Sequence, residues 1–290
     1  MFIGRTRACY SLALLTCNRF FLGSAFQQIV HLPRKHFIAR QYSGTTFRMS
    51  SDVRVDVGAN LEEVKNTIAQ ACKDAGRQVD DVRLVAVSKT KPLELLQSAY
   101  EHGQRIFGEN YAQELVEKAE AMGKDDIQWH FIGGLQSNKA NMLVKGVVPY
   151  GKLVVETVAS MKVARKLDNA MDGFDGKSLE VFVQINTSGE DSKSGVGLEE
   201  AVELCQKIVN DCQHVKLKGV MTIGAPGDLE CLDALVDCRN QVAEKLGMDP
   251  KDLEVSMGMS GDYVEAIQRG STNVRVGSTI FGERDYSNKK

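Results

Sequence analysis

The sequence predicts an α/β protein built as a single (β/α)8 barrel, with one additional helix before the first strand. Short apolar runs alternate with amphipathic stretches of helical length, which indicates parallel strands joined by helices. Eight such units fit into roughly 240 residues, a usual size for a closed barrel. A doubly wound open sheet is the alternative, but no G-x-G-x-x-G fingerprint follows the first strand.

The additional helix is expected from Leu61 to about Ala75, with Asn60 as its N-cap and Gly76 just beyond its end. The apolar runs predict strands at Arg83–Val87, Arg105–Phe107, Gln128–Ile132, Leu153–Thr157, Glu180–Ile185, Leu217–Ile223, Glu254–Ser256 and Asn273–Val276. The amphipathic stretches predict helices at Pro92–His102, Tyr111–Met122, Gln136–Val144, Ser160–Met171, Leu198–Asp211, Asp228–Leu246 and Asp262–Gln268, with a short last helix after Gly277.

The chain divides into a leader, residues 1–51, and a barrel, residues 52–290. The leader has no acidic residue, and its basic residues are Arg5, Arg7, Arg19, Arg34, Lys35, Arg40 and Arg48. This composition is typical of a mitochondrial transit peptide, and Met49 offers a start for a cytoplasmic form. Removing these seven positive charges from the net charge of −2 leaves −9 on the barrel. An acidic barrel argues against a nucleic-acid partner, and the leader's short apolar patches argue against a membrane span.

The cysteines do not indicate disulfides or a metal site. The sequence has seven, of which Cys9 and Cys17 lie in the leader. The remaining five form no C-x-x-C pair and show no metal-ligand spacing. We expect them to be reduced thiols that pack as small apolar side chains.

The chemistry of the chain is expected to centre on Lys89, at the end of the first strand. Four aliphatic residues, 84–87, indicate a strand buried on both faces, and Pro92 enforces a break soon after it. Barrel enzymes place their chemistry at this end of the strands. Burial there favours a neutral, nucleophilic amine that can condense with an aldehyde. The simpler interpretation is a lysine that extends to water, and Lys91 is a rival that we expect to be more hydrated.

The loops after the seventh and eighth strands are predicted to hold a phosphate. Ser260 and Asp262 can each cap the helix that follows the seventh strand, and Gly277 and Ser278 open another helical turn after the eighth. Helix N-termini attract anions, and barrels often bind phosphate in these two loops. The alternative is simple capping of two helices.

Arg275 is expected to point into the mouth of the barrel, because it lies two residues before Gly277 on a strand. A guanidinium there needs an acceptor. It can form a buried ion pair with Glu283 or Asp262, or it can donate to the ring nitrogen of a heteroaromatic ligand and keep that nitrogen unprotonated.

Three further sites carry polar residues near strand ends. Asn110 follows the second strand and is a candidate ligand contact. His130 lies inside an apolar run, where a histidine is more often a hydrogen-bonded core residue than a catalyst. Gln136, Asn138 and Lys139 open a helix and are either exposed polar residues or a second small anion site.

From about residue 60 to the end, the chain strongly resembles the pyridoxal phosphate homeostasis protein family. The resemblance rests on segments that recur in order: Val87–Pro92, Phe107–Tyr111, Trp129–Gly133, Leu135–Lys139, Ser192–Gly195, Ser256–Ser260 and Val274–Gly282. Two departures are minor. Gly134 stands at a position that varies in the family, and Ser278 stands where threonine is common, which keeps the hydroxyl.

The resemblance implies a barrel like the N-terminal domain of alanine racemase, with pyridoxal 5′-phosphate as the cofactor. It carries cofactor contacts over to six positions: Lys89 as the Schiff-base lysine, Ser260, Gly277 and Ser278 at the phosphate, Arg275 at the pyridine nitrogen, and Asn110 near the ring hydroxyl.

The resemblance further implies a protein that buffers or carries pyridoxal phosphate and maintains vitamin B6 and amino-acid homeostasis, and that is not a conventional enzyme. Chemistry agrees, because an arginine at the pyridine nitrogen weakens the ring as an electron sink and racemisation needs a second base. Racemases supply that base from an extra β-domain, which no segment of this sequence suggests. We expect a monomer that hands the cofactor to pyridoxal-phosphate-dependent apoenzymes. A monomeric amino-acid racemase is the main alternative, and a barrel enzyme acting on another phosphorylated metabolite is a third.

Overall fold

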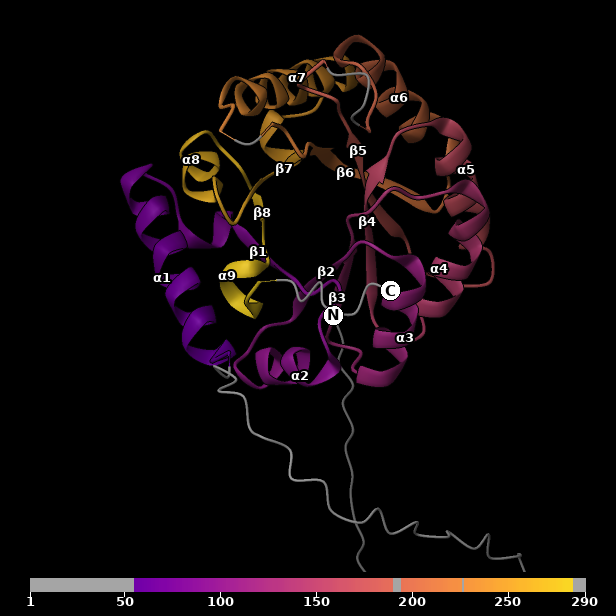
Figure 1. The fold of residues 1–290 in the computed structure, drawn as a ribbon. Helices are drawn as coiled ribbons and strands as arrows, with labels where there is room; N and C mark the ends of the chain where they lie inside the picture. The colour runs from indigo at the N-terminus through magenta and orange to yellow at the C-terminus, as the bar shows by residue number, and fades with distance from the viewer. Residues whose placement is uncertain (1–54, 190–193, 226, 284–290) are drawn as a thin grey trace, which may run out of the picture. The chain divides into compact units, whose positions relative to one another are not determined.

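The computed structural model describes residues 55–189, 194–225 and 227–283. Within these ranges the strands form a closed parallel barrel in the order β1 to β8, and helices surround it (Figure 1). The predicted (β/α)8 barrel is confirmed. An open sheet is excluded because β8 pairs with β1, with Leu84 opposite Val274. The predicted leader, residues 1–51, lies outside the described residues, as do Ser192 and Lys193.

Most strands begin and end within two residues of the predicted positions. The largest difference is β7, which continues three residues past Ser256 to Met259. Its pairing with β8 shifts between these two residues, so that Met259 lies opposite Arg275. Because the pairing shifts here, the alternation of apolar and polar residues in the sequence does not show where the strand ends. The strands are β1 Arg83–Val87, β2 Ile106–Glu109, β3 Gln128–Phe131, β4 Lys152–Val158, β5 Leu179–Gln184, β6 Val215–Met221, β7 Glu254–Met259 and β8 Asn273–Val276.

The helices follow the strands around the barrel, and α1 packs against α2, α8 and α9 (Figure 1). The short last helix after Gly277 is confirmed as α9. The helices are α1 Val57–Asp74, α2 Leu93–Glu101, α3 Ala112–Met122, α4 Ala140–Val147, α5 Met161–Ala170, α6 Leu198–Asp211, α7 Glu230–Leu246, α8 Tyr263–Gln268 and α9 Ser278–Phe281, with 3-10 turns η1 Val79–Asp81, η2 Ser137–Lys139 and η3 Pro250–Asp252.

The predicted start of α1 is wrong by one turn. Asp56 is the N-cap, and its side chain accepts a hydrogen bond from the Ala59 backbone N–H at 3.0 Å. Asn60 lies inside the helix, and its side chain donates instead to the Ile280 carbonyl in α9 at 3.1 Å. Asparagine is a favourable N-cap residue, but the side chain of Asn60 is bonded to α9 and therefore does not cap α1.

The barrel strands present apolar residues to the helices and a partly polar set to the interior. On β8, Val274 and Val276 belong to the main hydrophobic core, whereas Asn273 and Arg275 share the opposite face. On β4, Glu156 lies on the same face as Val154 and is fully buried. A carboxylate and a guanidinium therefore stand inside the barrel, where branched apolar residues are usual.

The cysteines of the described residues are all free and buried, as expected for side chains that pack as small apolar groups. Burial raises the pKa of Cys205 to about 12, so this thiol is not reactive. In the described ranges, no helix has the length and apolar character that crossing a membrane requires. No group of three or more His, Cys, Asp or Glu side chains in those ranges could hold a metal ion.

Candidate functional site

Five of the six predicted site residues line one cavity at the C-terminal end of the barrel. The cavity has a volume of about 290 Å³. It is open to solvent between the loops that follow β1, β7 and β8. Its lining residues are Val87, Lys89, Lys91, Ile132, Met259, Ser260, Gly261, Arg275, Gly277, Ser278 and Gly282.

Lys89 lies on the cavity wall two residues after the end of β1 and is only partly exposed. The next residue, Thr90, has a φ of 62°, a left-handed conformation that is rare for a β-branched side chain. Lys91 also reaches the cavity, but its ammonium donates to the carbonyls of Gly282 at 2.8 Å and Glu283 at 2.6 Å. The turn therefore separates the two lysines, and the second is tied to the segment after α9.

The loops after β7 and β8 meet at the other side of the cavity. The Ser260 hydroxyl accepts a hydrogen bond from the Gly277 backbone N–H at 3.2 Å. A Cβ on Gly277 would come within 3.1 Å of the Val87 carbonyl oxygen, so a larger residue would press against β1. Ser278 begins α9, where the first backbone N–H groups have no acceptor within the helix.

The predicted capping of α8 is not found. Asp262 is the N-cap residue, but its carboxylate accepts no hydrogen bond from the backbone of α8. It accepts instead from the Met259 backbone N–H at 2.6 Å, at the end of β7. Ser260 bonds to Gly277 in the neighbouring loop instead of capping a helix. Simple capping therefore does not explain Ser260, whose hydroxyl links the two loops.

Arg275 is 3% exposed and forms its polar contacts at the floor of the cavity. It donates to Ser256 Oγ at 2.6 Å and to the Thr222 carbonyl at 2.7 Å, and it lies 3.9 Å from a Glu156 oxygen. Neither Glu283 nor Asp262, the predicted ion-pair partners, bonds to it. The sequence suggested ion-pair partners that are close to Arg275 in the chain. In the closed barrel, the contacts come instead from Glu156 on β4 and from the Thr222 carbonyl after β6.

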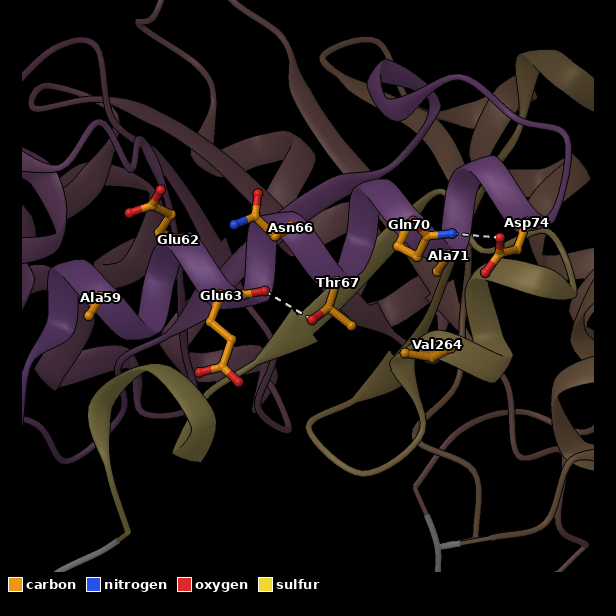
Figure 2. Close-up of a pocket in the computed structure, with 9 residues that line it drawn as sticks. All are labelled: Ala59, Glu62, Glu63, Asn66, Thr67, Gln70, Ala71, Asp74 and Val264. Carbon is orange, nitrogen blue, oxygen red and sulfur yellow. Dashed lines mark hydrogen bonds between the residues drawn. The ribbon is translucent and has the colours of Figure 1, made fainter.

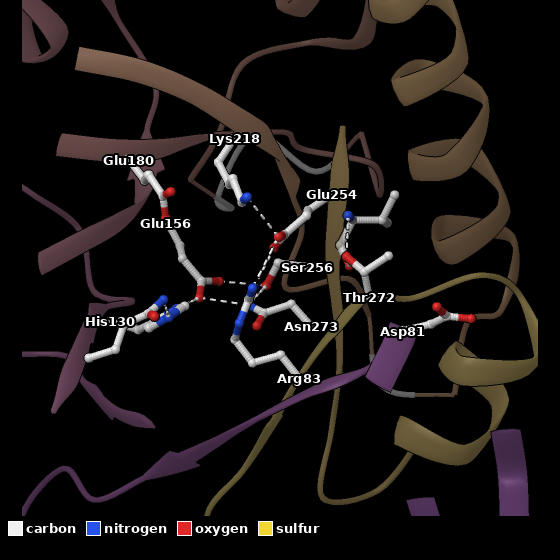
Figure 3. A network of polar contacts seen from close by, with 12 residues as sticks. Asp81, Arg83, His130, Glu156, Glu180, Lys218, Glu254, Ser256, Thr272 and Asn273 are labelled. Atoms are coloured by element: carbon white, nitrogen blue, oxygen red, sulfur yellow. Dashed lines mark hydrogen bonds and ion pairs between the residues drawn. The ribbon is translucent and has the colours of Figure 1, made fainter. Parts of the chain in front are cut away.

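Glu156 is the centre of a buried polar network inside the barrel (Figure 3). It accepts hydrogen bonds from the Ser256 hydroxyl and the Asn273 amide, the latter at 2.8 Å, and it contacts His130 Nδ1. Burial acts to raise the pKa of Glu156, but the hydrogen bond and charge of His130, the charge of Arg275 and the Ser256 hydroxyl hold that pKa below its ordinary value. The carboxylate is therefore charged, and it balances the guanidinium of Arg275.

Sequence reasoning missed this network. The signal was present in the strand run Leu153–Val158, where a single carboxylate interrupts apolar residues. A charge inside a buried strand requires a partner, and the strand that supplies that partner depends on the closure of the barrel.

Asn110 is the one predicted residue that does not line the cavity. It directly follows β2, and its backbone lies so close to Gly133 that a Cβ there would collide with the Asn110 carbonyl oxygen. Its side-chain Oδ1 is buried and has no hydrogen-bond partner within the described residues. An unsatisfied buried amide oxygen is rare and fits a donor that a ligand would bring.

His130 and Lys139 lie in different surroundings, one in the core and one at the surface. His130 is fully buried, and its ring bonds to Glu156 and to the Gln128 amide, so it belongs to the core network. Lys139, Asn138 and Gln136 are exposed around η2.

A larger hollow of about 620 Å³ runs along the outer face of α1 (Figure 2). Its lining includes the carboxylates of Glu62, Glu63 and Asp74 and no basic side chain. An acidic surface repels a phosphate, whereas Lys89, Lys91 and Arg275 attract one. The barrel mouth is therefore the better candidate site for an anionic ligand.

Comparison with known proteins identifies relatives of this chain. A family model described as "Alanine racemase, N-terminal domain" matches residues 59–285. The pyridoxal phosphate homeostasis protein of Bos taurus is 44% identical over 253 residues, which cover 83% of this chain and 92% of the relative. The protein of the same name from Caenorhabditis elegans is 45% identical over 243 residues, which cover 80% of this chain and 98% of the relative.

Solved structures give the same fold. PipY of Synechococcus elongatus, with pyridoxal phosphate bound, is 30% identical and superimposes with a TM-score of 0.63, covering 78% of this chain and all of that one. An alanine racemase from Clostridium difficile is 16% identical, with a TM-score of 0.59. The match covers 79% of this chain and 61% of the racemase, and it bears on the fold alone.

Proposed function

We propose that this chain, which belongs to the pyridoxal phosphate homeostasis protein family, binds pyridoxal 5′-phosphate at the mouth of its barrel and buffers or carries it without turning over a substrate. The observation that carries this proposal is the arrangement of one cavity. Lys89 lines it after β1, Arg275 lies at its floor, and Ser260, Gly277 and Ser278 line it after β7 and β8. An amine, a cation and an anion cradle are thus combined in the way that an aldehyde on a phosphorylated pyridine ring requires.

The residues at the β7 and β8 loops fit the phosphate of this cofactor. The Ser260 and Ser278 hydroxyls and the first N–H groups of α9 are hydrogen-bond donors, and none of the described residues that line the cavity carries a carboxylate. The absence of a side chain on Gly277 lets an oxygen approach the backbone closely. The phosphate would be held here chiefly by backbone amides and hydroxyls.

Lys89 would bind the cofactor covalently. The cofactor supplies an aldehyde that condenses with the neutral amine of Lys89 to form a carbon–nitrogen double bond, with release of one water. Lys91 is less suited, because its ammonium donates to two backbone carbonyls that hold it in place.

Arg275 would face the pyridine nitrogen, and Asn110 the ring hydroxyl. Ser256 and Thr222 hold the guanidinium in place, and it is a donor that does not give up its proton at neutral pH. It would therefore give no proton to the ring, and its positive charge would keep the ring nitrogen unprotonated. The buried Asn110 Oδ1 fits a hydroxyl donor, which would satisfy its unmet hydrogen bond.

The non-enzymatic role is supported by the groups that line the cavity. Of the residues that the structure places there, only Lys89, Lys91 and Arg275 are charged, and none is a Tyr, His, Cys, Asp or Glu. An α-proton taken from one face of a bound amino acid and returned to the other needs a second base. With Lys91 bonded to carbonyls, the described residues that line the cavity include no good candidate for that base.

Deuterium exchange tests the proposal against the racemase alternative. Cofactor-loaded protein is incubated with L-amino acids in deuterated water, and the α-protons are followed by NMR and the enantiomers by chiral chromatography. We expect neither exchange nor racemisation above the rate of free pyridoxal phosphate. Rapid exchange that disappears in Lys89→Ala would establish the racemase instead.

A transfer assay tests the carrier role itself. Loaded protein is mixed with a pyridoxal-phosphate-dependent apoenzyme across a range of free-cofactor scavenger concentrations, and recovery of the apoenzyme's activity is measured. Reactivation that persists when the scavenger removes released cofactor supports direct transfer, whereas its complete loss supports buffering through the free pool.

The leader is proposed to direct the chain to mitochondria. Its seven basic residues and lack of acidic ones support this proposal. Fusion of residues 1–51 to a fluorescent reporter tests it, and a form beginning at Met49 is expected to remain in the cytoplasm.

A further inference from the structure

A cluster of charged side chains lies directly behind the turn that carries Lys89. It joins Ser88, after β1, to Glu109 at the end of β2 and to Glu114 and Lys118 on α3. The Lys118 ammonium donates to Glu109 Oε1 at 2.8 Å and to Glu114 Oε1 at 2.7 Å. The Glu109 side chain is fully buried, and that of Lys118 is only 10% exposed.

The cluster fixes the backbone on the strand side of Lys89. Lys118 donates to the Ser88 carbonyl at 2.8 Å, and the Ser88 hydroxyl donates to Glu109 Oε1 at 2.6 Å. Ser88 itself is fully buried. Backbone and side chain of the residue before Lys89 are therefore both held, and the bond from the Lys118 ammonium to the backbone is charge-assisted and so stronger than a neutral one.

The same cluster fixes the backbone on the loop side. The Thr90 N–H donates to Glu114 Oε1 at 2.6 Å, and the Lys91 N–H donates to the Ser88 carbonyl at 3.0 Å. Thr90 adopts its left-handed conformation at this point. A β-branched residue occupies that region only where its surroundings impose it, and such residues cluster at functional sites. The hydrogen bond to Glu114 and the one that closes the turn between Lys91 and Ser88 hold the backbone on either side of this conformation.

We propose that Lys118, Glu109 and Glu114 are positioning residues that direct the Lys89 amine toward the aldehyde of the cofactor. The proposal rests on the proposed cofactor role of Lys89. None of the three lines the cavity, so they act through the backbone of Ser88 and Thr90 rather than by touching a ligand. A buried cation between two carboxylates costs desolvation that apolar packing would avoid, so fixing this turn is a reason for its presence.

The test measures the rate of covalent capture separately from total binding. Full-length Glu114→Ala, Lys118→Met and Lys118→Arg are each mixed with pyridoxal phosphate, quenched with borohydride at set times and examined by intact mass. Total binding is measured by equilibrium dialysis without borohydride, and folding by thermal melting. The matched control is Lys207→Met, which breaks an exposed i,i+4 pair with Glu203 on α6.

We expect Glu114→Ala and Lys118→Met to slow capture by about tenfold, the effect of losing one or two charge-assisted hydrogen bonds, while total binding falls much less. Lys118→Arg should restore most of the rate, and Lys207→Met should leave it unchanged. Glu114 is 23% exposed, so its alanine variant can fold even where Lys118→Met does not, and its result alone decides.

The proposal is overturned if folded Glu114→Ala captures the cofactor at the wild-type rate, or if capture and total binding fall together. These outcomes differ from a failure of the proposed function. If the wild-type chain forms no covalent adduct, the role of Lys89 is wrong. If it forms one and the variants match it, only the positioning role is wrong.

Discussion

The two sides of the cavity are built in different ways. On the lysine side, buried or partly buried charged groups hold the turn: Lys118 and Glu109 bond to Ser88, and Glu114 accepts from the Thr90 N–H. On the phosphate side, the parts are a glycine, hydroxyls and the start of α9, all partly or fully exposed. The difference indicates separate tasks. A covalent bond needs one fixed direction, whereas an anion needs accessible donors.

Lys89→Ala should have the largest effect on cofactor binding, because it changes one side of the cavity and leaves the other as it is. It removes the only group proposed to bind covalently and leaves the phosphate side intact, so the adduct disappears while weaker binding remains. Lys91→Ala should retain the adduct, because Lys91 bonds to the carbonyls of Gly282 and Glu283. Absorbance of the bound cofactor measures the adduct in both variants, and equilibrium dialysis measures the weaker binding that remains in Lys89→Ala. An adduct that survives in Lys89→Ala would move the assignment to another lysine.

Glu156→Gln tests the floor that both sides share. It removes the charge that balances Arg275 and leaves a buried cation unpaired, which should lower the free energy of unfolding by about 3 kcal/mol. Glu203→Gln, in the exposed pair on α6, should cost much less, because exposed ion pairs contribute little to stability. Urea denaturation measures both. A loss for Glu156→Gln as small as that of the control would show that the network does not support Arg275.

Glu109→Gln tests the lysine side through pH. Burial raises the pKa of Glu109 to about 7, and Lys118 and Ser88 only partly offset this. Because the folded pKa lies above the unfolded one, the folded state binds the extra proton. This contribution is complete below the unfolded pKa and is lost as pH rises through about 7. The wild type should therefore lose about 2 kcal/mol relative to Glu109→Gln between about pH 5.5 and 8.5.

Urea denaturation of the two proteins at both pH values checks this sign. Groups common to both cancel in the difference. A difference that does not change with pH, or that grows in favour of the wild type at high pH, would mean that Glu109 does not titrate in this range.

Ser260→Ala should have the smallest effect. It removes one hydroxyl from the phosphate side and leaves the Gly277 N–H free to bind a ligand. In a Lys89→Ala background, where binding is not covalent, affinity for pyridoxal phosphate should fall by about fivefold, the value of one hydrogen bond. Thr67→Ala, on the outer face of α1 (Figure 2), is the matched control and should change nothing. An unchanged affinity in Ser260→Ala would remove this hydroxyl from the phosphate site.

The difference between the two sides of the cavity also explains which site residues the sequence could predict. Lys89, Gly277 and Ser278 were found because they end or follow apolar runs, and the barrel rule places all such ends at one mouth. The closed barrel itself followed from the number of strand–helix units.

The sequence could not predict contacts that depend on which strands face each other across the barrel. The partner of Arg275 on β8 lies on β4, more than a hundred residues earlier, and no local pattern encodes that distance. The bond from Glu114 to Thr90 depends in the same way on the packing of α3 behind β1.

Borohydride reduction of the wild-type chain saturated with pyridoxal phosphate, followed by peptide mapping, tests the central claim most directly. We predict one reduced adduct, on Lys89, with loss of the bound cofactor's visible absorbance band. An adduct on Lys91 or on another lysine, or no adduct at all while the cofactor remains bound, would contradict it.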